Sequence, residues 1–370
     1  MGMPLPSGVL PPGLLERLSV LHPGARVLSV TRLGTGDANA TGGTAKGLGY
    51  GRPIRVVLEA DEGLFDLVLH TAQPDGFGHD RRSDRVAEML LAWDTFGAIP
   101  RHVRATDVGM IDGSGTLISL ANTGEAYLLS RWAEGTPYAL DLRRVSREGR
   151  ASDEDVRRAR ALATLLGEIH AGHGSQPLAY TRAWRDLVGS GEGIAGIADG
   201  YSAEDAEVPG APPGRIEAIE SACLGWRHRH RHRADRLRRT HGDFHPFNVL
   251  FHGADPVLLD TSRGSEGEPA DDVACMAINF LFFGLEHRAS WESGLGRLWR
   301  EFFDAYQVAR SDPGLYDVIA PFFAWRGLVV SSPAWYPHMS AADRDRILRF
   351  VERVLAAERF DPAMGPEAMR

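Results

Sequence analysis

The stretch 239-RTHGDFHPFNVLFHGADPVLLDTSRG-264 sets three oxygen-bearing side chains among residues that are typical of buried strands. These side chains belong to Asp243, Asn248 and Asp260, and the residues around them are rich in Phe, Val and Leu. Carboxylate and amide oxygens are hard donors, which suit Mg²⁺ where water and phosphate complete its coordination. The stretch therefore predicts a site for a divalent ion and a phosphorylated ligand.

The same stretch predicts a hairpin that would bring these donors together. Residues 249–251 and 257–260 are short apolar runs, and the five residues between them, 252–256, suit a hairpin turn. Pairing of the two strands would carry Asn248, at the start of one, and Asp260, at the end of the other, to the same edge. We therefore expect the donors to converge, although they are far apart in the sequence.

The spacing of the loop before the first strand indicates a particular chemistry. Residues 241–248 read H-x-D-x-x-x-x-N, the pattern of the catalytic loop of kinases. The chain also resembles the aminoglycoside phosphotransferase and choline kinase group of the protein-kinase-like fold. That group has a segment like H-G-D-x-H-P-x-N, then an Asp that closes a strand, then G-[DE]-P-x-x-D-[LV]-A. Here these motifs are residues 241–248, Asp260 and residues 267–274, in the same order.

The resemblance implies a role for each matching residue. Asp243 would be the catalytic base, or would orient the attacking hydroxyl group, and His241 would brace the loop. Asn248 and Asp260 would hold Mg²⁺, and Asp272 would fix the backbone of the loop from the helix that follows. The implied cofactors are ATP and Mg²⁺, and the implied activity is transfer of the γ-phosphoryl group to a hydroxyl of a small molecule.

One part of the kinase pattern is altered. Kinases of this type place a cation on the third strand, paired with a Glu on the next helix, to hold the phosphates. Here His70 stands at that position, and its expected partner is Glu88. Three alternatives follow. In the first, His70 itself holds the phosphates. In the second, an Arg of the 81–82 pair or Lys46, the only lysine in the sequence, replaces it. In the third, nucleotide binding is weak. In the last case the protein would be a pseudoenzyme that binds a ligand or partner without phosphoryl transfer.

Two further segments have expected roles in nucleotide binding. Residues 34–43 are rich in Gly, Ala and Thr, so Gly34 and Gly36 would lie in a flap over the phosphates. Residues 127–137 would link the two lobes, where the backbone around Arg131 and Trp132 would contact the adenine edge.

The pattern of elements predicts an α+β, two-lobe protein-kinase-like fold. We expect an N-terminal extension at residues 1–25, a small β-rich nucleotide-binding lobe at 26–132, and a larger, mostly helical lobe at 133–370. The strands expected in the small lobe are residues 26–33, 53–60, 65–72, 115–121 and 126–132, with one helix at 80–96. The helices expected in the large lobe are residues 153–172, 214–237, 269–283, 292–309, 316–332 and 341–358. Residues 186–214 are expected to be an irregular insertion.

The composition of the chain limits the classes of partner that it is expected to bind. The chain has 370 residues and a net charge of −8, so a nucleic-acid partner is not expected. Its cysteines, Cys223 and Cys275, are too few for a disulfide framework, which is typical of a reducing compartment. The longest apolar run, residues 273–285, is too short to span a bilayer, and the N-terminus has no secretory pattern. We therefore expect a cytoplasmic protein without a membrane partner, and the sequence leaves its oligomeric state open.

The acceptor is also left open by the sequence. Acidic pockets suit aminoglycosides, and aromatic pockets suit choline-like cations. The chain offers acidic residues after the metal-binding Asp (Glu266, Glu268 and Asp271) and aromatic residues near its C-terminus (Trp291, Trp299, Phe302, Phe303, Phe322, Phe323, Trp325, Trp335 and Tyr336). His245 is either structural or directed at the substrate. The run 227-RHRHRHR-233 is expected to be a solvated helix face.

Overall fold

The computed structural model describes residues 11–33, 53–61, 63–201 and 208–369. The chain divides into two compact units, residues 1–130 and 131–370. The first contains the longest of the described strands and the second is mainly helical, so the predicted α+β architecture is confirmed. The predicted flap residues Gly34 and Gly36, and Lys46, lie outside the described residues.

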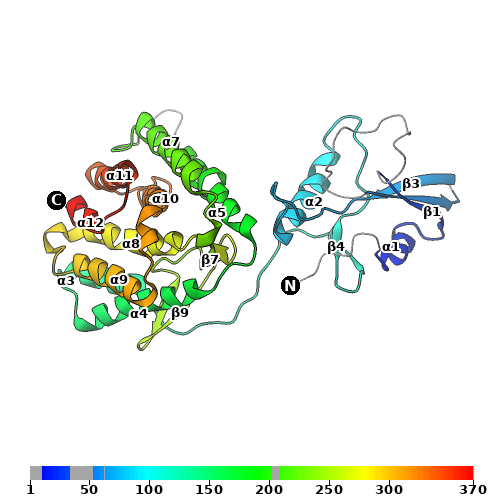
Figure 1. Cartoon of the computed structure of the whole chain (residues 1–370). Helices are drawn as coiled ribbons and strands as arrows, with labels where there is room; N and C mark the ends of the chain where they lie inside the picture. Colours follow the sequence, from blue (N-terminus) through cyan, green and yellow to red (C-terminus); the bar gives the residue numbers. More distant parts are fainter. Residues whose placement is uncertain (1–10, 34–52, 62, 202–207, 370) are drawn as a thin grey trace. The chain divides into compact units, whose positions relative to one another are not determined.

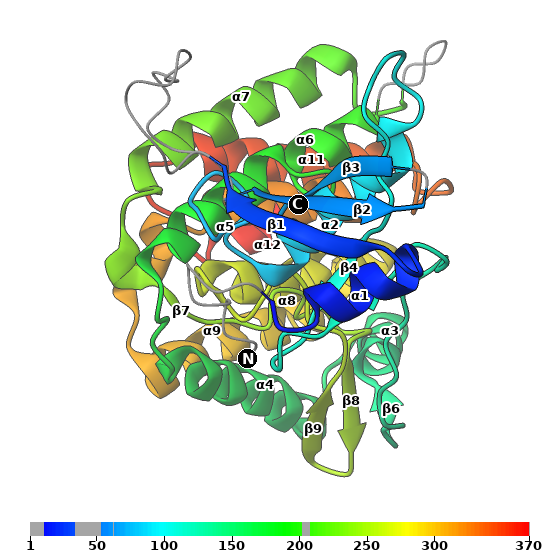
Figure 2. The ribbon, with the colours of Figure 1, turned by 90° about the vertical axis from the view of Figure 1, so that its right-hand side faces the viewer.

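The first unit is built on a three-stranded antiparallel sheet with β2 in the middle (Figure 2). Its strands are β1 (Arg26–Arg32), β2 (Ile54–Ala60) and β3 (Gly63–Leu69), and its helices are α1 (Leu14–Leu21) and α2 (Arg82–Phe96). Alternate residues of β2 are buried with Leu14 and Leu18 of α1, so this helix is part of the core of the unit.

A separate hairpin in the first unit pairs β4 (Gly109–Ile111) with β5 (Leu117–Ser119). The strand predicted at 126–132 is wrong, because residues 123–134 contain neither helix nor strand. The aromatic and aliphatic residues of this run have strand propensity, but no described strand pairs with them. A strand needs a partner for its backbone hydrogen bonds, and propensity alone does not provide one.

Helices form most of the second unit, and α8 (Ala270–Gly284) runs through the middle of them (Figure 1). It is buried over nearly its whole length, because the residues after its first turn are small or apolar except Asn279, whose side-chain amide donates to the carbonyl of Cys275. The other helices are α3 (Tyr138–Glu148), α4 (Asp153–Ala171), α5 (Pro177–Gly189), α6 (Ile194–Asp199), α7 (Pro213–His230), α9 (Leu295–Arg310), α10 (Ala320–Val330), α11 (Ala341–Ala356) and α12 (Met364–Ala368). All of the predicted helices are present, although α7 ends earlier than expected. The predictions missed α3, α5, α6 and α12, as well as α1 of the first unit. The predicted irregular insertion at residues 186–214 is partly wrong, because α6 lies within it. None of the described helices combines the length and the apolar character that crossing a bilayer requires.

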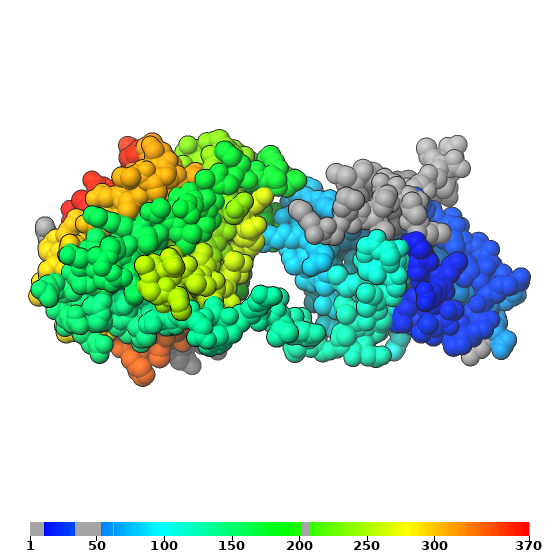
Figure 3. Space-filling model, turned by 90° about the horizontal axis from the view of Figure 1, so that it is seen from below, coloured from blue at the N-terminus to red at the C-terminus, as the bar shows by residue number. Residues whose placement is uncertain are grey.

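Two short ribbons hold the quoted stretch within the second unit. In one, β8 (Val249–His252) lies between β9 (Asp255–Leu258) and β6 (Thr136–Pro137), and all pairs are antiparallel. In the other, β7 (Arg238–Arg239) pairs with β10 (Glu266–Gly267). The predicted hairpin is confirmed, but its turn is the two residues Gly253 and Ala254 rather than five. Gly253 has a φ of +63°, and the tip of the ribbon reaches the surface beside the helices (Figure 3).

Candidate active site

The two ribbons bring two irregular segments side by side. Residues 240–248, called here the 240–248 loop, connect β7 to β8, and residues 259–265 connect β9 to β10. The amide of Thr240 donates to the carbonyl of Ser265 at 3.1 Å, and the amide of Ser262 donates to the carbonyl of His241 at 3.4 Å. Because both ends of each segment are paired in strands, the loop lies in a fixed place against its neighbour.

Asp272, in the first turn of α8, holds the backbone of the 240–248 loop. Its carboxylate accepts the amides of His241 and Gly242, each at 2.7 Å. The predicted role of Asp272 is therefore confirmed. His170 of α4 lies 3.1 Å from the same carboxylate and 2.8 Å from the hydroxyl of Tyr306. Burial opposes ionisation of Asp272, but the hydrogen bond with His170 and those from the loop amides outweigh it and lower the pKa.

His241 contributes to the loop through its ring. Its Nδ1 accepts the amide of Asp243 at 3.3 Å, and the ring packs edge-on against Phe244. The Nε2 atom is buried without a hydrogen-bond partner among the described residues. These contacts lie within the loop itself, so they agree with the bracing role that the sequence suggested.

Asn248 contacts both Asp243 and Asp260, but it reaches Asp260 only through the backbone carbonyl, so the predicted convergence of all three side chains stays a prediction. Its Nδ2 donates to Oδ2 of Asp243 at 3.2 Å, to the carbonyl of Asp243 at 3.2 Å, and to the carbonyl of Asp260 at 3.4 Å. These bonds use the NH₂ end of the amide, which leaves its oxygen without a bond to any described residue. The Asp260 side chain is exposed, has no hydrogen bond or ion pair to a described residue, and stands on a backbone with a φ of +46°.

These donors suit Mg²⁺ by their chemistry. An amide oxygen and a free carboxylate are hard ligands, and Mg²⁺ commonly takes one or two protein ligands and completes its shell with water and phosphate. Among the described residues, no three His, Cys, Asp or Glu side chains cluster closely enough to form a metal site by themselves. A site based on Asn248 and Asp260 would therefore depend on phosphate and water for its other ligands.

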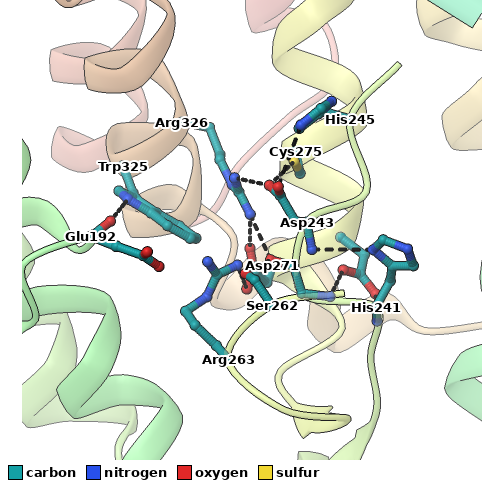
Figure 4. A network of polar contacts seen from close by, with 12 residues as sticks. Glu192, His241, Asp243, His245, Ser262, Arg263, Asp271, Cys275, Trp325 and Arg326 are labelled. Carbon is teal, nitrogen blue, oxygen red and sulfur yellow. Dashed lines mark hydrogen bonds and ion pairs between the residues drawn. The ribbon is translucent and has the colours of Figure 1, made fainter. Parts of the chain in front are cut away.

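The carboxylate of Asp243 is held at both oxygens (Figure 4). Nη1 of Arg326 in α10 donates to Oδ1 at 2.8 Å, and the thiol of Cys275 in α8 lies 3.9 Å from the same atom. Nε2 of His245 lies 3.4 Å from Oδ2. Burial of Asp243 opposes its ionisation, but the hydrogen bond with His245 and the charge of Arg326 outweigh burial and lower its pKa. Asp243 is therefore a carboxylate throughout the neutral range.

The structure also places His245, which the sequence left between two roles. Its Nδ1 accepts the amide of Phe247 at 3.1 Å. A neutral histidine that accepts at one nitrogen carries its proton on the other, so Nε2 can donate toward Asp243. His245 therefore supports the loop and the Asp243 carboxylate together.

Sequence reasoning missed Arg326, which makes the shortest side-chain contact with the Asp243 carboxylate among the described residues. This arginine is 6% exposed and lies in an otherwise apolar helix, 320-APFFAWRGLVV-330. A single charge in a buried apolar helix is rarely left unpaired, because burial of an unpaired charge costs several kcal/mol. That pattern was the available signal that Arg326 has a buried acidic partner.

The acidic residues that the sequence offered for a cationic acceptor already have partners. Glu268 is buried and bonds to Arg236 and the hydroxyl of Tyr180. Asp271 pairs with Arg326 and Arg263, at 3.0 and 3.1 Å. Glu266 accepts the amide and hydroxyl of Ser175.

Most of the aromatic residues considered for a cation cage are core residues. The buried ones are Trp291, Trp299, Phe302, Phe303, Phe322, Phe323 and Trp325. In the 227–233 run, most residues are exposed or half-buried, but the ring of His230 stacks between Trp184 and Trp226. The run is therefore only partly a solvated face.

In the first unit, the expected pair of His70 and Glu88 is not formed between these two described residues. His70 is exposed just after β3, and the carboxylate of Glu88 lies 3.5 Å from Nε2 of His79 instead. Nδ1 of His79 also lies 3.0 Å from Asp75. Glu88 therefore has a histidine neighbour, but one from the turn before α2 rather than from the third strand.

Arg131 and Trp132, expected at the adenine edge, lie in the run without helix or strand. Nε1 of Trp132 donates to Glu134 at 2.9 Å. Their expected contact with adenine remains a prediction.

Comparison with known proteins gives the family. Residues 112–322 match the APH phosphotransferase enzyme family. Similar solved structures include an ethanolamine kinase from Plasmodium vivax (10% identity, 86% of this chain and 78% of that chain, TM-score 0.34). Another is an amicoumacin kinase in complex with AMP-PNP, Ca²⁺ and Ami (12% identity, 94% of this chain and 95% of that chain, TM-score 0.36). A third is an aminoglycoside phosphotransferase from Streptomyces rimosus (16% identity, 74% of this chain and 89% of that chain, TM-score 0.32).

No curated protein matches the chain. The family match spans more than half of the sequence and includes residues 241–248, Asp260 and residues 267–274, which carry the three motifs. The chain therefore belongs to the APH phosphotransferase enzyme family, as the order of its motifs predicted.

Proposed function

We propose that this protein transfers the γ-phosphoryl group of ATP, with Mg²⁺, to a hydroxyl group of a small molecule. The observation that supports this most directly is the position of Asn248, whose NH₂ group bonds to the Asp243 carboxylate and to the Asp260 backbone. One side chain thereby joins the carboxylate expected to orient the acceptor to the backbone of the residue whose carboxylate is expected to hold the metal. Phosphoryl transfer requires this proximity, because its catalysis consists mainly of positioning and charge stabilisation.

In the proposed reaction, Asp243 accepts a hydrogen bond from the acceptor hydroxyl and directs its oxygen at the γ-phosphorus. The bond from the γ-phosphorus to the β,γ-bridging oxygen breaks, and ADP leaves with that electron pair. A bond from the acceptor oxygen to phosphorus forms, and the hydroxyl proton passes to Asp243 and then to solvent. Because the pKa of Asp243 is low, its main contribution is orientation of the hydroxyl rather than early removal of the proton.

The oxygens of Asn248 and Asp260 would hold Mg²⁺, which would supply positive charge to the phosphate oxygens. The exposed Asp260 carboxylate is suited to this role because no described residue neutralises it. The NH₂ group of Asn248 already donates hydrogen bonds to Asp243 and Asp260, so the amide oxygen is the atom available to bind the metal ion.

A second candidate is a kinase-like module that binds a ligand without phosphoryl transfer. The specific observation in its favour is the exposed His70, which has no ion pair with the described Glu88. A neutral histidine would hold the phosphates more weakly than the usual lysine.

Nucleotide binding and turnover distinguish the two candidates. Wild type should be stabilised against thermal unfolding by MgATP, and Asp260→Asn should lose most of the Mg²⁺-dependent part of that shift. Asp243→Asn should still bind MgATP but should lose about 10²- to 10⁴-fold in kcat for ADP release, the range expected for a general acid–base residue. The exposed Asp235 provides a control, since Asp235→Asn should match wild type.

Two outcomes would contradict the proposal. Full turnover by Asp243→Asn would remove the assigned role of this carboxylate. Stabilisation by MgATP without any turnover, for a broad set of hydroxylated acceptors and for water, would favour the binding module.

A further inference from the structure

We propose that Arg326 is a positioning residue that fixes the Asp243 carboxylate for attack by the acceptor. This inference rests on the proposed function, and it adds a residue outside the motifs that identify the family. The loop motifs lie within residues 241–274, whereas Arg326 comes from α10, in a distant part of the sequence.

The contacts of Asp243 show why a positioning group is needed. Its Oδ2 faces Asn248 at 3.2 Å and His245 at 3.4 Å, and both of these come from the same loop. Its Oδ1 is fixed by Arg326 at 2.8 Å, with the thiol of Cys275 farther away at 3.9 Å. Among the described residues, Arg326 therefore provides the one charged contact that ties the carboxylate to a helix of the unit.

Arg326 is itself held in place by three further contacts. Its Nη2 donates to the carbonyl of Gly242 at 2.9 Å and to Asp271 at 3.0 Å. Its guanidinium lies 3.8 Å from the centre of the Trp325 ring. A guanidinium can donate in several fixed directions and stack at the same time, which a lysine cannot do. The side chain thus links the loop backbone, the carboxylate of Asp243 and α8 in one fixed geometry (Figure 4).

The arrangement extends to the segment between α5 and α6. Nε1 of Trp325 donates to the carbonyl of Glu192 at 2.8 Å, which fixes the ring on which Arg326 stacks. Arg263 lies 4.1 Å from the centre of the same ring and pairs with Asp271, but no contact joins it to the described Asp243. Arg263 therefore shares the stacking and the acidic partner of Arg326 without its contact to Asp243, so it offers a matched control.

A purely structural ion pair would predict a different result from a positioning contact. If Arg326 only neutralises buried charge, its removal should lower stability and leave the kinetics of the folded enzyme unchanged. If it positions Asp243, the folded variants should bind nucleotide normally and react slowly, because a displacement of about 1 Å at a reacting group can cost about 100-fold in rate.

The test measures MgATP hydrolysis, with water as the acceptor, for Arg326→Met, Arg326→Lys and Arg263→Met. We expect Arg326→Met to lose about 100-fold in kcat with an unchanged KM for MgATP. Arg326→Lys should recover part of this loss because it keeps a charge near Asp243. Arg263→Met should lose thermal stability but keep wild-type kcat. Unchanged kcat in folded Arg326→Met, or an equal loss in Arg263→Met, would overturn the inference.

A second measurement applies even if Arg326→Met is too unstable for kinetics. Thermal unfolding of Arg326→Lys, Asp243→Asn and their double variant reports whether the two side chains interact. We expect the loss of Tm in the double variant to be smaller than the sum of the single losses, because each single change weakens the same contact between the two side chains. Simple addition of the two losses would overturn the inference. Wild-type enzyme that neither binds nor hydrolyses MgATP would instead reject the proposed function on which it rests.

Discussion

At the scale of single residues, unusual backbone conformations gather around the 240–248 loop. Gly242 and Gly264 have φ values of +84° and +86°, and the non-glycine residues Asp260 and Arg263 have +46° and +56°. Such conformations cost about 1–3 kcal/mol for residues with a side chain, and they persist where the surrounding structure enforces them. Here they let two irregular segments approach closely, which brings Asp260 and Asp243 near Asn248.

Gly242 is the position where this close approach is most demanding. A Cβ atom there would lie 2.2 Å from the carbonyl oxygen of Ser262, in addition to the strain of its positive φ. We predict that Gly242→Ala lowers the free energy of unfolding by at least about 2 kcal/mol and also lowers turnover, because the loop must move. Urea denaturation and ADP release measure the two effects.

Gly253, in the β8–β9 turn, is the matched control for Gly242. It also has a positive φ, but a Cβ atom there would meet nothing within 4 Å. Gly253→Ala should therefore lower the free energy of unfolding by only about 1 kcal/mol and leave turnover unchanged. Equal effects of the two substitutions would show that the approach to Ser262 does not constrain the loop.

At the scale of elements, one buried arginine ties three short segments around the loop. Arg236 of η1 (Ala234–Arg236) bonds to Glu268, which follows β10, and to Asp312, which caps η3 (Pro313–Asp317). The Asp312 carboxylate also accepts the amide of Leu315 at 3.1 Å. These bonds connect the entrance of the β7 strand to the end of α9, so they support the ribbon on which the 240–248 loop depends.

The Asp312 carboxylate should give this support a defined pH dependence. Burial opposes its ionisation, but hydrogen bonds and charge from Arg236 outweigh burial and lower its pKa in the folded protein. A lowered pKa means that the carboxylate stabilises the fold above its unfolded value, about 3.9, and loses this contribution as the pH falls further. Asp312→Asn should therefore cost about 1.5–3 kcal/mol at pH 7.

Urea denaturation at several pH values measures this difference. The difference in free energy of unfolding between wild type and Asp312→Asn should be constant from about pH 5 to pH 8. It should become smaller below about pH 4. A difference that widens toward low pH would contradict the assigned direction of the shift.

The elements also show what the sequence could and could not predict. The β8–β9 hairpin and helices α8, α9, α10 and α11 were predicted because strong apolar patterns and turn residues mark them. Helices α3 and α5 were missed, although Tyr180, Trp184 and Leu187 of α5 have helical spacing and are buried. Residues 126–132 were wrongly predicted as a strand, since strand propensity does not show whether a partner exists.

The polar contacts were less predictable than the elements. Sequence motifs gave Asp243, Asn248 and Asp272 because these lie close together in the chain. They did not give Arg326 or His170, which reach the same loop from α10 and α4. Such contacts depend on how helices pack, and a single sequence does not specify that packing.

At the scale of the whole molecule, the two units have cores of different size. The first buries five apolar residues, Leu14, Leu18, Ile54, Val56 and Leu58, among the residues described. The core of the second extends over nearly all of its helices and includes α8, which anchors the 240–248 loop through Asp272. Because buried apolar area is the main source of stability, the unit with the smaller core should be the less stable one.

This difference predicts two unfolding transitions that respond to different substitutions. Leu58 of β2 and Leu166 of α4 are both fully buried, one in each core. Leu58→Ala and Leu166→Ala should each lower the free energy of unfolding of their own unit by about 2–5 kcal/mol. Leu58→Ala should lower only the temperature of the earlier transition, and Leu166→Ala only that of the later one. Differential scanning calorimetry measures the transitions, and hydrogen exchange of peptides from β2 and α4 assigns them. A single transition that both substitutions lower equally would show that the two cores unfold as one, and that the residues proposed to bind the metal and orient the acceptor depend on the first unit for their stability.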